Sequence, residues 1–143
     1  MHGHRRQGRT YALQLLYQLE QNPEPVDAAK DRFWRGSHAS GRAREFGTML
    51  VEQTMAHREA IDAALNASLQ RWKLQRLPAV VRNVLRLSYC EMLIVADVPF
   101  QVVVNEAVEL TRAFMDEESA RFVNSVLEKC WRAARGDDSP PAQ

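Results

Sequence analysis

The sequence predicts an all-α protein, and two observations carry that prediction. Apolar residues recur at helical spacing along most of the 143 residues, and no segment alternates with the period of a strand for long. The stretch 77–100, LPAVVRNVLRLSYCEMLIVADVPF, places apolar residues around more than half of a helix circumference. A helix of this kind is buried. We therefore expect a helical bundle arranged around one central helix.

The central helix has clear start and stop signals. Pro78 suits the first turn, where its missing N–H costs nothing. Pro99 ends the run, because the residue before a proline is disfavoured in the helical region. Glu91 stands among apolar residues, and a buried carboxylate needs a fixed partner. We expect an arginine or a tyrosine to provide that partner, with no catalytic role for Glu91.

The composition indicates an ordinary globular protein. Hydrophobic residues make up 45% and charged residues 26%, and the formal net charge is only +1. Any nucleic-acid site must therefore come from local clustering of charge. Cys90 and Cys130 lie in apolar patterns without metal-ligand spacing, which favours reduced core thiols, no bound metal and a cytoplasmic location. The central run contains charges and is shorter than 20 residues, so no membrane span is expected.

The rest of the chain reads as helices separated by turn signals. We expect helices near 8–21, 26–34, 42–69, 99–114 and 116–135, with a loop at 36–41 and an open choice between one long helix and a bend near 56–58. The WKLQRL turn should dock Trp72 and Leu74 on the core. These elements suggest two helical subdomains, 1–70 and 71–135, followed by a tail at 136–143.

The first helix has a second apolar side. Its main stripe packs inward and consists of Ala12, Leu15, Leu16 and Leu19. Leu13 and Tyr17, four residues apart, project to the opposite side together. Either another helix of the same chain covers them, or they form a partner surface. Periodicity alone leaves both readings open.

The sequence contains none of the common catalytic motifs. It has no phosphate loop, no dinucleotide-binding glycine pattern, no zinc-protease pair and no nucleophile elbow. Glu106 and Glu109 are three residues apart, which a solvated helix face explains. The sequence therefore predicts a protein that is not an enzyme and needs no cofactor.

Two surface features are compatible with RNA. Arg5, Arg6 and Arg9 form a basic cluster near the N-terminus, and Phe122 lies at the edge of an apolar helix face beside Arg121. An aromatic ring next to a guanidinium can stack on an unpaired base. From Phe122 alone, an aromatic that simply caps the core is the better interpretation. The two features support each other only if the fold brings them to one surface.

Four segments resemble the NusB transcription antitermination family. RRQGRTYALQLLYQLE is similar to the family's opening, in which arginines precede A-x-Q-x-L-Y, and LPAVVRNVLRLSYCEML is similar to its central helix. VPFQVVVNEAVELTRAF and ESARFVNSVLEK resemble its last two motifs. The resemblance covers nearly the whole chain, is weakest over 22–72 and is absent after Arg135.

The resemblance implies a NusB-like bundle of two small helical subdomains without enzymatic activity. Such a protein binds boxA RNA of ribosomal RNA operons as a single strand, together with NusE, a small ribosomal subunit protein. The assembly modifies RNA polymerase so that it passes terminators. Carried over by position, the RNA-binding residues are Arg5, Arg6, Arg9, Glu118, Arg121 and Phe122. Tyr17 falls on the NusE-facing side, which favours Leu13 and Tyr17 as partner surface.

Two positions depart from the family pattern. Gln7 stands where relatives often carry a basic residue, and Val81 stands where some carry an acid facing NusE. An apolar Val81 at the partner surface also favours self-association, so a homodimer is a further expectation. Two other functions stay open: a helical protein-binding adaptor without RNA, and an RNA-binding module related to that of rRNA methyltransferases. The second is weakened because no cofactor-binding Rossmann half is present.

Overall fold

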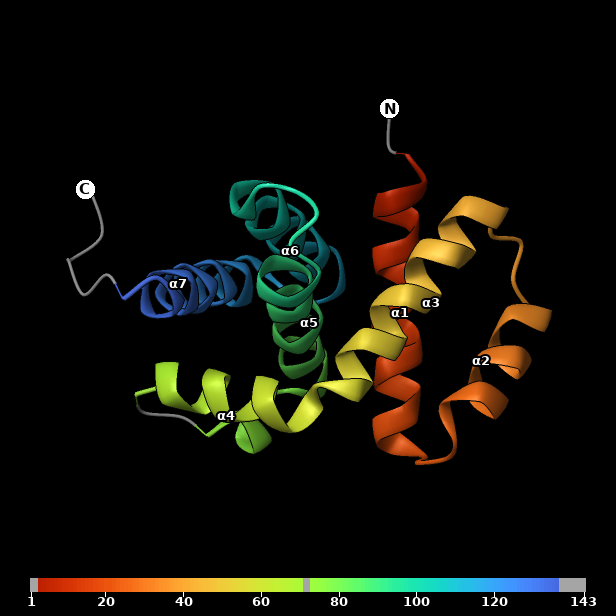
Figure 1. Ribbon diagram of the computed structural model, residues 1–143, viewed down its shortest axis with the longest axis horizontal. Helices are drawn as coiled ribbons and strands as arrows, with labels where there is room; N and C mark the ends of the chain where they lie inside the picture. The colour runs from red at the N-terminus through yellow and green to blue at the C-terminus, as the bar shows by residue number, and fades with distance from the viewer. Residues whose placement is uncertain (1–2, 71–72, 137–143) are drawn as a thin grey trace.

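The chain folds as a bundle of helices, as the sequence predicts. The computed structural model describes residues 3–70 and 73–136, and within them no residue is in a strand (Figure 1). The elements are α1 (His4–Gln21), α2 (Val26–Arg35), α3 (Gly41–Ala56), α4 (Arg58–Ser68), the 3₁₀ turn η1 (Leu74–Arg76), α5 (Ala79–Tyr89), the π-helical segment η2 (Cys90–Val95), α6 (Phe100–Phe114) and α7 (Glu117–Ala134).

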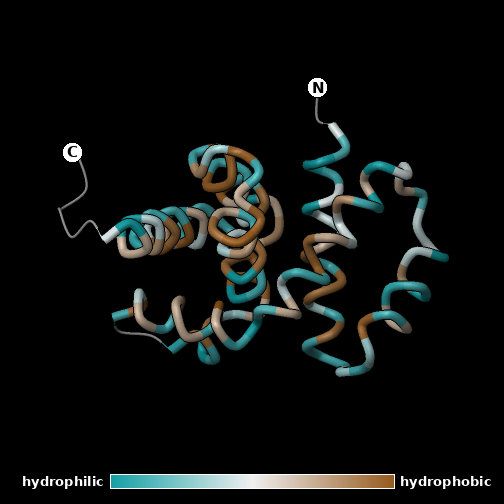
Figure 2. Tube along the Cα trace, in the orientation of Figure 1, coloured by the Kyte–Doolittle hydropathy of each residue, from teal (hydrophilic) through white to brown (hydrophobic). Residues whose placement is uncertain are grey.

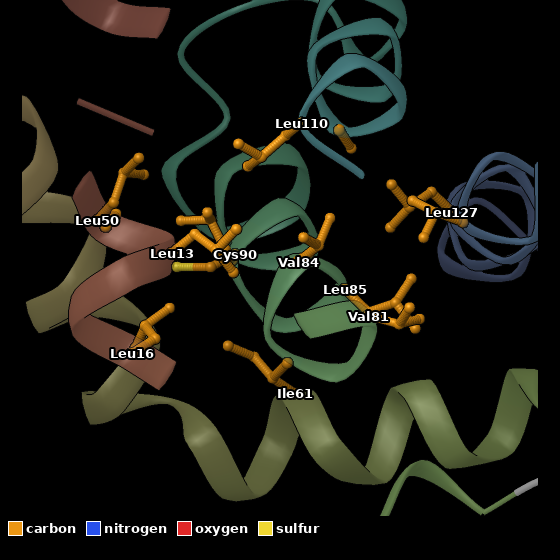
Figure 3. Packing of buried hydrophobic residues seen from close by; sticks show 14 of the residues in the cluster. Leu13, Leu16, Leu50, Ile61, Val81, Val84, Leu85, Cys90, Leu110 and Leu127 are labelled. Carbon is orange, nitrogen blue, oxygen red and sulfur yellow. The ribbon is translucent and has the colours of Figure 1, made fainter. Parts of the chain in front are cut away.

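The helix α5 is the centre of the bundle. It contacts α1, α3, α4, α6 and α7, and it is coloured mostly brown, for apolar residues, in Figure 2. Figure 3 shows Val84 and Leu85 of α5 among side chains from the surrounding helices. Burying apolar surface contributes about 25 cal/mol per Å². The predicted central helix is therefore confirmed, and the rest of the fold packs against it.

The polar residues of α5 are paired with acids from two neighbouring helices. Arg82 and Arg86 both bind Glu20 of α1, at 2.5 and 2.6 Å, and Arg86 also binds Asp62 of α4 at 2.8 Å. These contacts hold the pKa of Glu20 at about 2: burial raises it, and the hydrogen bonds from the two arginines lower it by more. These ion pairs thus join α1, α4 and α5.

The central run ends in a π-helical turn. The segment η2 continues α5, and Ala96 then adopts a left-handed conformation, with φ of 50°, while its N–H donates to the carbonyl oxygen of Glu91 at 2.9 Å. A non-glycine residue rarely takes this conformation. The helix therefore stops at Ala96, before the proline at 99 that the sequence points to.

Two glycines let α1 and α3 approach closely. Gly8 and Gly47 face each other, and a methyl group added at either would lie 2.9 Å from a backbone oxygen of the other helix. Gly8 was expected at the start of the first helix. It lies inside α1, which begins four residues earlier, at His4. The two helices lie side by side on the right of Figure 1, with α2 outside them.

The remaining expectations concern the turns and the chain ends. The long helical pattern at 42–69 forms two helices that meet at His57, so the bend is confirmed. Leu74 is fully buried, as predicted, while Trp72 lies outside the described residues. Gly136 ends α7 with φ of 71°, and the predicted tail lies beyond it, outside the described residues.

The proposed division into two subdomains at residue 70 stays a prediction. In the fold, α4 packs on both α5 and α7.

Among the described helices, none is long and apolar enough to cross a membrane.

Candidate nucleic-acid interface

The first two arginines of α1 lie at the surface, where Arg6 faces α6 and Arg5 faces the turn before it. The Nη2 of Arg5 is 2.7 Å from a carboxylate oxygen of Asp97, and Arg6 makes two hydrogen bonds to Glu106, at 2.6 and 3.0 Å. Each of the two side chains keeps about 40% of its surface exposed. A phosphate could therefore reach both guanidinium groups, but it would meet them next to a carboxylate.

Arg9 lies in the interior, contrary to the expectation of an accessible phosphate contact. Its guanidinium donates two hydrogen bonds to Glu91, at 2.5 and 2.7 Å, and the two side chains are 8% and 1% exposed. It also lies 3.4 Å from Glu106. This pair confirms the expected arginine partner of Glu91. It also corrects the interpretation of Glu106, which is half-buried against two arginines instead of lying on a solvated face.

A hollow of about 400 Å³ follows the seam between α1 and α6. Arg6 and Glu106 lie at one end of it, and Phe114, the last residue of α6, lies at the other. A second hollow of about 250 Å³ begins at the same Phe114. It is lined by Leu13, Gln14, Tyr17, Val80 and Phe114 and is almost entirely apolar.

The predicted outward pair Leu13 and Tyr17 is only half right. Leu13 is 2% exposed, and Figure 3 shows it pointing from α1 towards α5, near Cys90. Tyr17, one turn later, is 41% exposed. The helix α1 is covered by α3 on one side and by α5 on another, so its apolar residues fall on more than one buried face. Leu13 is therefore the floor of the second hollow and Tyr17 its rim.

Two residues of this apolar hollow were not predicted. Phe114 continues the spacing of the buried Leu110, yet it is 43% exposed because α6 ends there. Val80 lies in the hollow, while Val81, the residue expected to face a partner, is 3% exposed. Val81 lies on the side of α5 towards Leu127 of α7 (Figure 3). Val80, one residue earlier, is thus the residue that borders the hollow, and Val81 is buried.

A third hollow, also about 250 Å³, lies where α5 and α7 begin. Its lining residues are Arg76, Leu77, Pro78, Val81, Glu118, Ser119 and Phe122. Phe122 is half-buried and packs on the core, as an aromatic that caps the core would, and it also lines the hollow. Glu118 and Arg121 are exposed. Three of the residues expected at an RNA surface, Glu118, Arg121 and Phe122, therefore lie within two turns of α7.

The first turn of α7 is strongly acidic. Asp116 caps the helix by accepting a hydrogen bond from the backbone N–H of Ser119 at 2.7 Å, which lowers the pKa of Asp116. Glu117 pairs with Arg112 at 2.6 Å. In the described part of the chain, Glu118 has no such ion pair. Its charge is uncompensated beside Phe122.

The hollows lie at the two features that the sequence left apart, since Arg6 lines the first and Phe122 lines the third. The first and second share Phe114, and the second and third are lined by the consecutive residues Val80 and Val81 of α5. Within the described residues, no group of three acidic, histidine or cysteine side chains could hold a metal ion.

The chain has relatives among known proteins. The family model described as "NusB family" matches residues 6–132. The transcription antitermination protein NusB of Anaeromyxobacter dehalogenans strain 2CP-1 is 42% identical over 130 residues, which cover 90% of this chain and 91% of that protein. The protein of the same name from Trichlorobacter lovleyi is 38% identical over 127 residues, 89% of each chain.

Two solved structures share the fold. A crystal structure of the antitermination factors NusB and NusE in complex with double-stranded RNA contains a chain with a TM-score of 0.85 and 27% identity, covering 93% of this chain and 99% of that one. The solution structure of NusB from Aquifex aeolicus has a TM-score of 0.82 and 26% identity, covering 98% of this chain and 95% of that one.

Proposed function

This chain belongs to the NusB family, and we propose that it binds boxA-type single-stranded RNA of ribosomal RNA operons together with NusE. The family consists of transcription antitermination factors that bind RNA and are not enzymes. In this proposal the RNA-bound assembly joins RNA polymerase in the cytoplasm and lets it pass terminators. The observation that carries the proposal is the pair of hollows at Arg6 and at Phe122, the first of which shares Phe114 with the apolar hollow at Tyr17.

The RNA surface has a polar end and an aromatic end. At the α1 end, Arg5 and Arg6 offer N–H groups to phosphates. At the α7 end, the ring of Phe122 borders a hollow next to the exposed Arg121, which suits stacking of an unpaired base. Arg9 has a different role here: it is buried against Glu91 and holds α1 and Glu106 in place, so it positions Arg6 without touching RNA.

The NusE surface is the apolar hollow around Tyr17. Tyr17 and Phe114 are the exposed aromatic residues at its rim, and Leu13 and Val80 lie between them. Exposed aromatic side chains around an apolar hollow are typical of protein contacts. Because Phe114 also borders the hollow at Arg6, RNA and NusE would meet on this residue. Self-association through this same hollow, as a homodimer, would compete with NusE.

Variants in the two surfaces separate this function from its alternatives. Phe122→Ala with Arg121→Gln should weaken boxA-type RNA binding about tenfold or more, since one stacked base contributes about 1–3 kcal/mol, and should leave NusE binding unchanged. Tyr17→Asp should abolish NusE binding and keep the helical circular dichroism signal. A protein-binding adaptor would lose nothing with the first variant. Unfolding of Tyr17→Asp would show that Tyr17 belongs to the core.

A further inference from the structure

The turn between α2 and α3 carries a group of arginines that the proposed RNA surface does not use. Arg35, Arg42 and Arg44 are exposed, and the segment from Gly36 to Arg44, GSHASGRAR, contains no acid. Among residues 3–70 and 73–136, none of the three has an ion-pair partner, unlike Arg5, Arg6 and Arg9. Their charges are therefore available to an anionic ligand.

Two of these arginines, Arg35 and Arg44, line a groove with an aromatic floor. The groove measures about 840 Å³ between α2 and α3, and Arg35, Arg44 and Trp34 are among its lining residues. Trp34 is held in place: its Nε1–H donates to the Oγ1 of Thr48 at 2.9 Å, and its ring packs edge-to-face on Tyr11, with 5.3 Å between ring centres. The floor of the groove is thus rigid.

Arg44 lies on this floor. Its guanidinium carbon is 5.6 Å from the centre of the Trp34 ring, within the range of a cation–π contact, and the Arg44 side chain is otherwise exposed. A guanidinium supported on one face by an indole can stack a nucleobase on the other. Arg35, which also lines the groove, and the exposed Arg42, two residues before Arg44, can supply N–H donors for phosphates.

Acidic residues limit how strongly the groove attracts an anion. Glu52 is paired with Lys30 at 3.0 Å, while Asp31 and Glu45 are exposed at the rim. The charges of the lining residues cancel, and the exposed Arg42 just outside the lining adds one positive charge. A weak, flexible contact with a single strand fits this balance better than a tight contact with a duplex, which carries one charge per about 1.7 Å.

The groove is next to the proposed RNA surface. Arg5 lies 4.8 Å from the ring centre of Phe46, and Gly8 touches Gly47, so the start of α3 runs beside the start of α1. The first turns of both helices lie in the upper right of Figure 1. Arg42 and Arg44 precede Phe46 by four and two residues. A strand that leaves Arg5 would meet them next.

We propose that the groove between α2 and α3 binds unpaired RNA nucleotides that flank the boxA-type segment. Arg35 and Arg42 contact phosphates, and Arg44, supported by Trp34, stacks on a base. The inference rests on the proposed RNA binding and extends it to a second, sequence-tolerant contact. The function would be a longer footprint on the transcript, with specificity still set at α1 and α7.

The test compares a short boxA-type RNA with the same RNA extended by unpaired nucleotides at either end. The variant is Arg42→Gln with Arg44→Gln, and the matched control is Lys73→Gln with Arg135→Gln, which removes the same charge elsewhere on the surface. All proteins should bind the short RNA alike. On the extended RNA, wild type and control should bind about threefold to tenfold more tightly than the variant, and the salt slope of the variant should be smaller by about 0.7 units, because one phosphate contact, that of Arg42, is lost.

Each outcome decides a separate point. If wild type does not bind the short RNA, the proposed function fails and this inference fails with it. If the short RNA binds but the variant keeps the full gain from the extension, only the flanking contact is wrong. If the variant instead loses NusE with RNA affinity unchanged, the groove is a protein surface. Arg44→Lys keeps the charge without the planar face, so wild-type binding by that variant would overturn the stacking role.

Discussion

Replacing Arg9 with methionine should destabilise the fold without removing an RNA contact. In the native chain both oxygens of Glu91 accept hydrogen bonds from Arg9, at 2.5 and 2.7 Å, and only 1% of the Glu91 side chain is exposed. Methionine keeps the length and the apolar stem but leaves the carboxylate buried and unpaired. Breaking a buried ion pair in this way costs about 3–5 kcal/mol.

The measurement is urea unfolding at neutral pH, followed by circular dichroism. The control is Arg5→Met, because the pair between Arg5 and Asp97 is about half exposed and should contribute under about 1 kcal/mol. Adding Glu91→Leu to Arg9→Met should restore most of the lost stability, since an apolar pair can replace a buried ion pair at little cost. A loss for Arg9→Met as small as that for Arg5→Met would refute the assignment.

Three further changes test other parts of the structure. Gly47→Ala should lower the free energy of unfolding by about 1–3 kcal/mol, although alanine favours helices, because its methyl group would meet the backbone of Gly8. Thermal melts would measure this, and Gly41→Ala, whose methyl group has free space, should be neutral in them. The pKa of Glu20 is lowered from 4.5 to about 2, so its charged form stabilises the folded state. The stability of wild type over Glu20→Gln should reach its full value, on the order of 3 kcal/mol, above pH 4.5 and should disappear as the pH falls to about 2. Urea titrations at several pH values would measure it. Glu118→Gln should bind boxA-type RNA more tightly at low salt, because an unpaired negative charge beside Phe122 is removed. The control, Glu59→Gln at another exposed acid, should bind like wild type. Equal binding by wild type and Glu118→Gln would place the RNA away from α7.

The helices and the central position of α5 could be predicted because they depend on local patterns. Apolar spacing, proline positions and the acidic first turn of α7 are properties of short segments. The partner of Glu91 could be predicted in kind, as an arginine, from the cost of an unpaired buried carboxylate. Which arginine it is depends on how α1 packs against η2, and no local pattern contains that information.

The errors at the site come from packing between helices. Leu13 lies away from the main stripe of α1, but α1 has a second buried face against α5. The helix α5 is apolar on most sides, so periodicity could not tell that Val80 and not Val81 borders the hollow at Tyr17. Arg9 looks like Arg5 and Arg6 in the sequence, and only the fold distinguishes a buried guanidinium from an exposed one. The close contact of Gly8 with Gly47 likewise requires two helices.

The central claim is tested most directly by binding of a labelled boxA-type RNA to this chain alone, to NusE alone and to the two together, with fluorescence anisotropy as the readout. A scrambled RNA of the same length and composition is the control. The structure predicts that the two proteins together bind the boxA-type RNA more tightly than either one alone, and more tightly than the scrambled RNA. Equal binding of both RNAs, or an affinity that this chain does not change, would contradict it.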